Sequence, residues 1–180
     1  MTTETEGVLE HVLPYCDGRG LDIGCGQRKV VPEAIGLDFA TEYNIKRHPA
    51  TAADLIGRWE ETLDKVPGLP VDYIYSSHLL EDYADIEPPL RAWTNAIRPG
   101  GYLILVLPIE QVFLAHCAAV GQLTNPGHKN DWESAGHFAQ ELPGWFLGQM
   151  HLEMKYSGVG SGSYSFVVVF RKHVGGKDNV

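Results

Sequence analysis

The sequence predicts an α/β fold of three layers, with a doubly wound, mostly parallel seven-stranded sheet that ends in an antiparallel hairpin. Three observations carry this prediction. Short apolar segments of strand length alternate with helical segments along much of the chain. Residues 102–107 are almost wholly apolar, which is typical of a parallel strand buried on both faces. Two long β-type segments close the sequence, and the turn between them is rich in Gly and Ser, as in a hairpin.

The elements before the apolar strand follow the same alternation. A short helix over 4–13 is expected to cover the core. In the helix expected over 86–97, Leu90, Trp93 and Ile97 recur at the spacing of one helix face. The remaining elements expected in this part are strands over 20–23, 34–39, 51–55 and 71–76 and a helix over 56–65.

After the apolar strand the pattern changes. Residues 109–120 are expected to be helical, and 121–136 form a long loop that is rich in Asn, Gly and His. A short helix is expected over 137–142. The hairpin strands are expected over 149–156 and 163–172, and parallel strands followed by such a hairpin indicate an open α/β sheet.

The composition is that of an ordinary globular protein with an acidic balance. Of 180 residues, 44% are hydrophobic and 21% charged, and the formal net charge is −9. Nucleic-acid-binding proteins usually carry a basic face, because phosphate neutralisation supplies most of their affinity. The 14 Lys and Arg residues are scattered along this chain, so we expect no nucleic-acid partner.

The sequence gives no sign of membrane insertion or export. No apolar run approaches the ~20 residues that a membrane span needs, and the acidic start of the chain does not resemble a signal peptide. We therefore expect a cytoplasmic protein with no membrane partner. Cys16, Cys25 and Cys117 are widely spaced and include no CxxC pair, so we expect neither a disulfide framework nor a metal site.

The segment Leu21–Gly26 ends the first expected strand with two glycines and places Asp22 just before them. Glycine lets the backbone approach a ligand closely and adopt positive φ. In open α/β sheets, ligands bind at the carboxyl ends of the strands. A dinucleotide fingerprint needs a third glycine where this chain has Lys29, which argues against a nicotinamide-dependent oxidoreductase.

Five segments, in order, resemble motifs of class I S-adenosylmethionine-dependent methyltransferases. LDIGCG at 21–26 resembles the first motif, and GLDFA at 36–40 resembles the second-strand motif whose acidic residue binds the ribose hydroxyls. AADL at 52–55 is similar to the adenine-contacting motif. Residues 72–83 resemble the fourth-strand segment, and 90–108 resemble the helix–PGG–strand signature. The terminal hairpin agrees with the family's reversed seventh strand.

The resemblance implies S-adenosylmethionine as the cofactor, with S-adenosylhomocysteine as its product. Asp38 would accept hydrogen bonds from the ribose hydroxyls, and Asp54 from the adenine amine, unless Asp54 is instead a helix N-cap. Asp22 and the glycine backbone would bind the ammonium group, and Phe39 and Leu55 would enclose the purine. The full set of cofactor-binding residues implied is Asp22, Gly24, Cys25, Gly26, Asp38, Phe39, Asp54, Leu55 and Ser76.

The resemblance also implies one methyltransferase-like domain over 1–173, followed by a disordered tail over 174–180. The sequence departs from the family pattern in three ways. Only about eight residues separate Gly26 from the second strand, so the usual first helix is absent or reduced to one turn. Residues 80–82 read Leu-Glu-Asp where many relatives have Leu-Glu-His. No separate substrate domain is seen, so the substrate site is expected from the loops 40–50, 77–88 and 121–137.

After the fourth strand, His78 is expected to act in catalysis as a general base, and Asp82, with its neighbour Glu81, to orient a substrate hydroxyl or amine. The alternative without a catalytic role is that His78 packs beside the cofactor. In that case the acidic pair Glu81 and Asp82 is solvated or caps the helix that follows. The later loop mixes basic, acidic and aromatic side chains, which is typical of recognition surfaces. Alternatively, that loop is mobile and its tryptophan packs in the core. The substrate-loop residues predicted are His128, Lys129, Asp131 and Trp132.

We therefore expect methyl transfer to a small polar acceptor, a sugar or glycan precursor by analogy with small relatives that have the same short spacing. The protein would hold nucleophile and methyl group in line at attack distance. A hydroxyl nucleophile would need a base, whereas a neutral amine or a carboxylate would not. The alternative is a non-catalytic S-adenosylmethionine-binding module that acts with a protein partner. A homodimer is left open.

Overall fold

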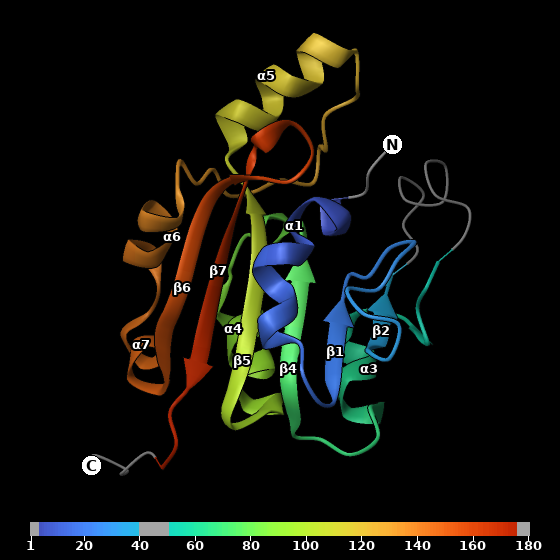
Figure 1. Ribbon diagram of the computed structural model, residues 1–180, viewed down its shortest axis with the longest axis vertical. Helices are drawn as coiled ribbons and strands as arrows, with labels where there is room; N and C mark the ends of the chain where they lie inside the picture. The colour runs from blue at the N-terminus through green and yellow to red at the C-terminus, as the bar shows by residue number, and fades with distance from the viewer. Residues whose placement is uncertain (1–3, 40–50, 176–180) are drawn as a thin grey trace.

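The computed structural model describes residues 4–39 and 51–175, which form a seven-stranded sheet (Figure 1). Its strands are β1 (Gly20–Ile23), β2 (Ile35–Asp38), β3 (Leu55–Ile56), β4 (Val71–Ser77), β5 (Ile97–Pro108), β6 (Met150–Val159) and β7 (Ser165–Lys172). The strand order is β3-β2-β1-β4-β5-β7-β6. Neighbours from β3 to β5 are parallel, whereas β7 is antiparallel to β5 and β6 is antiparallel to β7. This topology confirms the predicted mostly parallel sheet with an antiparallel C-terminal hairpin.

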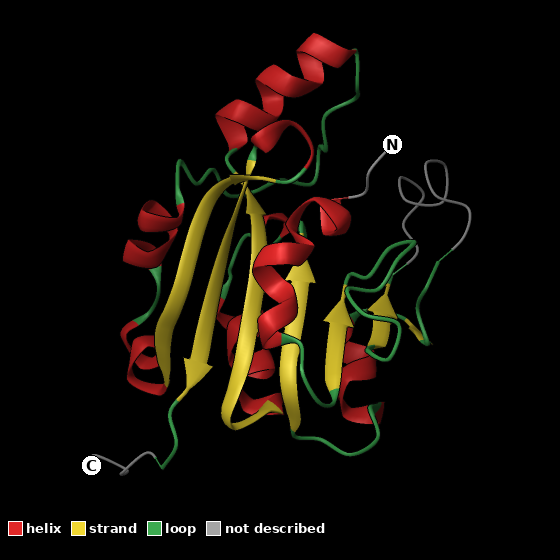
Figure 2. Cartoon of the chain, in the orientation of Figure 1, coloured by secondary structure: helices red, strands yellow, loops and turns green. Residues whose placement is uncertain are grey.

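Helices cover both faces of the sheet, which gives the three predicted layers (Figure 2). The helices are α1 (Glu4–Val12), α3 (Trp59–Thr62), α4 (Glu87–Ala96), α5 (Glu110–Val120), α6 (Ala135–Glu141) and α7 (Gly144–Gln149). Helix α1 crosses one face in front of β4 and β5, and α4 lies behind them (Figure 1). Helix α5 stands beyond the carboxyl end of β5, and α6 and α7 lie beside β6.

Strand β5 shows why the central strands are apolar at every position. Leu103, Leu105 and Leu107 belong to the larger apolar cluster, which includes residues of α4. Ile104 and Val106 belong to the second cluster, which includes residues of α1. Because side chains alternate between the two faces and both faces are buried, no position of this segment can be polar without loss of packing.

The connection from β1 to β2 contains no first helix, as the short spacing predicted. Residues 24–34, all of them described, form turns and bends. Asp22 anchors the segment, because its Oδ2 accepts a hydrogen bond of 2.6 Å from the main-chain N–H of Val30. Val30 and Ala34 are buried in the cluster that includes α1. The segment and α1 together therefore cover the face of the sheet that a first helix would otherwise cover.

Several element boundaries differ from those expected. Strand β5 begins at Ile97, so the Pro-Gly-Gly segment lies within the strand, with a register shift in its pairing to β4. Strand β3 is limited to Leu55–Ile56, and the helix after it begins at Trp59 and ends as a 3-10 turn, η2 (Leu63–Lys65). Helix α7 was not predicted. The tail expected over 174–180 lies mostly outside the described residues.

Among the described residues, none of the helices has both the length and the apolar character needed to cross a membrane.

Candidate functional site

The glycine turn after β1 lies at the carboxyl edge of the sheet and leaves open space in front of Gly26. Gly24 and Gly26 both have positive φ, 79° and 56°. The N–H groups of Gly24 and Cys25 donate to the carbonyl of Leu37 in β2, which holds the turn against the neighbouring strand. A Cβ added to Gly26 would meet no atom of the described residues within 4 Å. The turn therefore leaves the backbone of Gly26 open at the edge where α/β sheets bind ligands.

Asp38, the last residue of β2, reaches this turn. Its Oδ2 accepts a hydrogen bond of 2.6 Å from the N–H of Gly26. Partial burial raises the pKa of Asp38, while that hydrogen bond acts in the opposite direction. The structure thus brings together two of the residues that the sequence assigned to the cofactor, with a carboxylate beside an open backbone surface.

Asp22 lies beneath the turn rather than on it. Its side chain is 1% exposed, and Oδ1 has no hydrogen-bond partner among the described residues. Burial raises the pKa of Asp22 to about 7, although the Val30 N–H partly offsets this. Asp22 therefore has a structural role in the β1–β2 connection that the sequence did not indicate.

Asp54 lies just before β3, in a segment that is also joined to the glycine turn, since the N–H of Ala52 donates to the carbonyl of Gly26 at 2.8 Å. Its Oδ2 accepts hydrogen bonds from the N–H of Gly36, at 2.8 Å, and from Nζ of Lys29, at 3.0 Å. The Gly36 hydrogen bond, followed by that of Lys29, lowers the pKa of Asp54. The helix N-cap interpretation is wrong, because a strand follows Asp54.

The two residues expected to enclose the purine differ in exposure. Leu55 is partly buried against the larger apolar cluster, whereas Phe39 is 46% exposed. The guanidinium of Arg58 lies 5.8 Å from the centre of the Phe39 ring. Phe39 is thus an accessible aromatic surface one residue beyond Asp38, and Leu55 contributes mainly to packing.

Cys25 and Ser76 contribute little free side chain to the site. Burial, together with the nearby carboxylates, raises the pKa of the Cys25 thiol to about 12, so the thiol stays protonated at neutral pH. Ser76 is buried in β4, and its hydroxyl donates a hydrogen bond of 2.9 Å to the carbonyl of Ile23. The hydroxyl therefore joins β4 to β1.

A second group of polar side chains gathers after β4, where His78 begins the turn. His78 is one of two non-glycine residues in the described chain with positive φ, at 52°, and its N–H donates to the carbonyl of Val106. Its Nε2 lies 2.9 Å from Oγ of Ser165 in β7. Burial, with the neighbouring His128, lowers the pKa of His78 to about 3.

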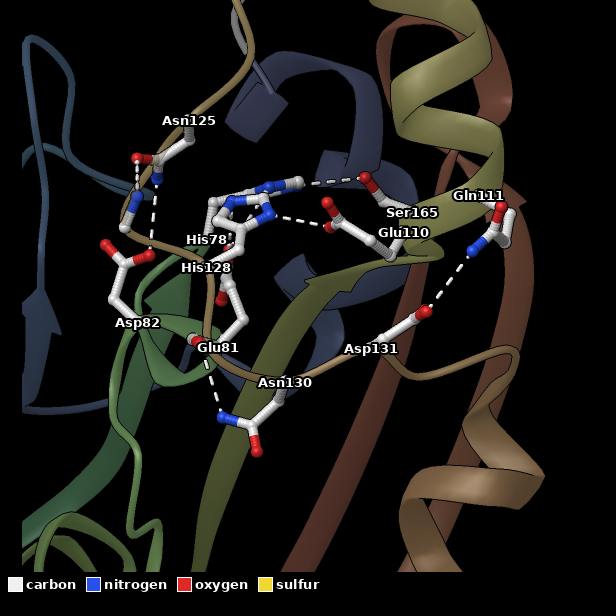
Figure 3. Close-up of polar contacts among 11 residues, drawn as sticks. His78, Glu81, Asp82, Glu110, Gln111, Asn125, His128, Asn130, Asp131 and Ser165 are labelled. Carbon is white, nitrogen blue, oxygen red and sulfur yellow. Dashed lines mark hydrogen bonds and ion pairs between the residues drawn. The ribbon is translucent and has the colours of Figure 1, made fainter.

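Glu81 lies in the following 3-10 turn, η3 (Leu80–Asp82), and is fully buried (Figure 3). Its Oε1 lies 3.6 Å from Nδ1 of His78 and 3.7 Å from Nε2 of His128. Burial raises the pKa of Glu81 well above its ordinary value. Sequence reasoning paired Glu81 with Asp82, either as groups that orient a substrate hydroxyl or amine or as a solvated or capping pair, and the complete burial of Glu81 excludes the solvated alternative for this residue.

The loop after α5 brings His128 to Glu81. The N–H groups of Lys129 and Asn130 donate to the main-chain carbonyl of Glu81, at 2.7 and 3.2 Å. His128 in turn places Nδ1 2.6 Å from Oε2 of Glu110 at the start of α5 (Figure 3). The loop residue His128 and the β4-turn residue His78, predicted separately, therefore belong to one cluster.

Asp82 lies at the side of this cluster, and its Oδ1 accepts a hydrogen bond of 3.2 Å from Nδ2 of Asn125 (Figure 3). Burial raises the pKa of Asp82, and His128 acts in the opposite direction. Thus Asp82 also fixes the loop after α5 against the turn after β4.

The other predicted substrate-loop residues are not gathered with His128. Lys129 is exposed, and Asp131 accepts a hydrogen bond of 3.2 Å from Gln111 of α5. The expectation that Trp132 contacts substrate is wrong for this structure, since its side chain is 1% exposed and Nε1 donates to Glu141 at 2.7 Å. Its packing in the larger cluster is the structural alternative. The expected substrate loop 40–50 lies outside the described residues.

No three His, Cys, Asp or Glu side chains within 4–39 and 51–175 are arranged to hold a metal ion. Both histidines of the cluster face carboxylates instead. With a carboxylate beside each ring, these residues can form hydrogen bonds and transfer protons.

Neither a family model nor a curated protein matches this sequence. Solved structures do. One is an S-adenosylmethionine-dependent methyltransferase from Thermotoga maritima, with a TM-score of 0.62 and 18% identity over 96% of this chain and 90% of that chain. Another belongs to the complex between the Haloferax volcanii Trm112 methyltransferase activator and a methyltransferase. Its TM-score is 0.59, with 15% identity over 95% of this chain and 92% of that chain.

A third is an S-adenosylmethionine-dependent methyltransferase from Archaeoglobus fulgidus, with a TM-score of 0.56 and 16% identity over 91% of both chains. The three comparisons cover nearly the whole described chain, and the sheet order with its reversed seventh strand agrees with them. The chain has the fold of class I S-adenosylmethionine-dependent methyltransferases.

Proposed function

We propose that this protein transfers a methyl group from S-adenosylmethionine to a small polar acceptor. The observation that carries the proposal is the Asp38 carboxylate held 2.6 Å from the N–H of Gly26, at the carboxyl edge of a sheet with methyltransferase topology. A carboxylate beside an open glycine backbone suits a ribose diol, which can donate two hydrogen bonds to it.

The cofactor would lie across the glycine turn. Asp38 would bind the ribose, Phe39 would stack on the adenine, and the backbone of Gly24 to Gly26 would line the methionine part. Asp22, Leu55 and Ser76 support this edge from within the fold, and Asp54 supports it from the surface, since each is engaged in a hydrogen bond or in packing. A role for Asp54 at the adenine amine is still proposed for its second carboxyl oxygen.

The bound cofactor supplies an electrophilic methyl group on a sulfonium, which needs no covalent enzyme intermediate. The protein's own residues must position the acceptor and accept the proton that the acceptor loses. His78 and Asp82 lie after β4, two strands along the sheet edge from Asp38. We place the acceptor above this turn, with His78 as the base and Asp82 as an orienting group. Sugar or glycan precursors are the acceptors that we propose to test first.

Calorimetric titration with S-adenosylmethionine and S-adenosylhomocysteine tests the proposal, with NAD as the negative control. The variant Asp38→Asn should weaken binding by about 1–3 kcal/mol, because a hydrogen-bonded carboxylate is lost at the ribose. Asp64→Asn is a matched control, since Asp64 is an exposed acid in η2. If neither sulfur compound binds the unmodified protein, or if both variants bind equally well, the cofactor site has been wrongly placed.

The alternative of a non-catalytic module with a protein partner has its own supporting observation. Helix α5 stands away from the sheet and carries exposed apolar side chains at Val112, Leu114 and Val120, followed by Leu123. Exposed apolar patches mark interaction surfaces in many proteins. Cofactor binding without turnover on any hydroxyl or amine acceptor would favour this alternative.

A further inference from the structure

We propose that a groove between α3 and α4 binds a small organic ammonium compound with an apolar body. The groove has a volume of about 520 Å³, and residues of α3, η2, α4 and the segment before β4 line it. Small-molecule sites commonly have volumes of about 300–1,000 Å³ and mostly apolar walls. Binding there is independent of the proposed methyl transfer, because none of the residues assigned to the cofactor or the acceptor lines the groove.

The groove lies at the end of the sheet opposite the candidate site. Leu69 and Pro70, which form part of its wall, immediately precede β4, whereas His78 follows the same strand. The 7 residues of β4 separate the two positions by about 23 Å, at a rise of about 3.3 Å per residue. Helices α3 and α4 both lie behind the sheet (Figure 1). A ligand in the groove would therefore contact neither the glycine turn nor the cluster around Glu81.

The walls of the groove are apolar. Trp59, Leu63 and Leu69 pack against the larger apolar cluster but are only partly buried. Ala92 and Ala96, four residues apart on one face of α4, line the groove with short side chains. Because alanine extends only a short way from the helix, the space between the two helices stays open. The apolar body of a ligand would remove this surface from water, which favours binding.

The rim of the groove is acidic. Glu60 and Asp64 both line the groove and are both exposed, and Asn95 of α4 adds an amide oxygen. The nine described lining residues include no Lys, Arg or His. Arg58 lies 3.5 Å from Glu60, but the side chains of both are exposed, and exposed ion pairs are weak. The groove therefore combines an apolar wall with a rim that attracts positive charge.

These two properties together select the class of ligand. An aliphatic amine is positively charged at neutral pH, since its pKa is close to that of a lysine side chain. Its ammonium group can donate hydrogen bonds to the carboxylates and to the Asn95 oxygen. A carboxylate or phosphate ligand would instead meet like charges at the rim. An uncharged ligand of the same shape would gain only the apolar contacts.

A nuclear magnetic resonance titration of the whole protein with 2-phenylethylamine tests this assignment. Protein with ¹⁵N-labelled tryptophan has four indole groups, and the variant Trp59→Phe identifies the Trp59 signal. We expect the amine to move that signal until it saturates and to leave the signal of buried Trp132 unchanged. The uncharged isostere 2-phenylethanol should bind roughly tenfold more weakly, which equals about 1.4 kcal/mol. Phenylacetate, which carries a negative charge, should bind more weakly still.

Two variants separate the charge from the apolar wall. Asp64→Asn should weaken binding of the amine roughly threefold, as expected for one exposed carboxylate, and leave 2-phenylethanol unchanged. Glu61→Gln is the matched control, because Glu61 is an exposed acid of α3 that does not line the groove, and its loss changes the net charge equally. Ala92→Leu fills part of the groove and should weaken binding of both the amine and the alcohol.

Several results would overturn the assignment. Equal affinity for the amine and the alcohol would show that the carboxylates take no part. Equal losses in Asp64→Asn and Glu61→Gln would assign the attraction to the net charge of the protein, and undiminished binding to Ala92→Leu would place the amine elsewhere. A Trp59 signal that none of the probes moves would exclude a ligand site in the groove. A signal that moves with protein concentration alone would assign the groove to a second copy of the chain.

Discussion

Replacement of Asp22 by Asn should make the protein more stable at alkaline pH. Asp22 is buried in β1, with Oδ2 bonded to the N–H of Val30 and Oδ1 without a hydrogen-bond partner in the described chain. The Asn side chain has the same shape, and its oxygen can accept the same hydrogen bond. The substitution therefore removes a buried charge without opening a cavity.

The pKa of Asp22 gives the size and sign of the effect. Burial raises it from 3.8 to about 7, so the folded state holds this proton more tightly than the unfolded state. Stability from this group is complete below pH 3.8 and is lost as the pH rises to about 7. At about 1.4 kcal/mol per pH unit, roughly 4 kcal/mol is lost by pH 8. The new amide N–H group, left unpaired, costs about 1–3 kcal/mol, so the net gain is about 1–3 kcal/mol.

Urea unfolding at pH 5 and pH 8 measures this prediction in both proteins. The free energy of unfolding of Asp22→Asn should change less between the two pH values than that of the unmodified protein. Asp64→Asn should follow the unmodified protein, since Asp64 is exposed. An Asp22→Asn variant that is less stable at pH 8, or that keeps the same pH dependence, would refute the reasoning.

Two further substitutions separate stability from binding. Trp132→Ala should lower the free energy of unfolding by about 3–5 kcal/mol, because it empties a core position. It should leave the affinity for S-adenosylhomocysteine unchanged in the fraction that folds, and a selective loss of affinity would restore Trp132 to the substrate site. Gly26→Ala should cost only about 1–2 kcal/mol of stability, for a side chain at φ 56°. Its Cβ would fill the open space of the turn, so calorimetry should show a large loss of binding, and unchanged affinity would place the cofactor elsewhere.

The sequence predicted those helices and strands whose own residues carry a recognisable pattern. The alternation of Leu103 to Leu107 between two apolar clusters requires the wholly apolar run from which the strand was expected. The absence of a first helix was predicted from the small number of residues between Gly26 and the second strand. The early start of β5 was missed because Pro99 and the two glycines normally interrupt structure, whereas here they form an irregular stretch of strand beside β4.

The candidate site was predictable only in part, because some of its partners are distant in sequence. Asp38 and Gly26 were found through motifs, and the structure places them in contact. His78, Glu81 and His128 were each singled out, but nothing in the sequence indicated that they would meet in one cluster. That contact depends on how the loop after α5 docks on a main-chain carbonyl, which has no sequence signature. Trp132 shows the opposite error, because an aromatic residue in a polar loop can belong to the core.

The replacement of a first helix by α1 has a consequence for the order in which this chain can fold. The front of the sheet is covered by residues from the beginning of the sequence, yet Val8 and Val12 pack in a cluster with Val167 and Val169 of β7. The ring of His11 stacks on Tyr156 of β6 at 4.2 Å. During synthesis, α1 therefore leaves the ribosome long before the strands that complete its binding surface. The parallel strands must wait with one apolar face uncovered, and contacts between such distant segments are expected to slow the final step of folding.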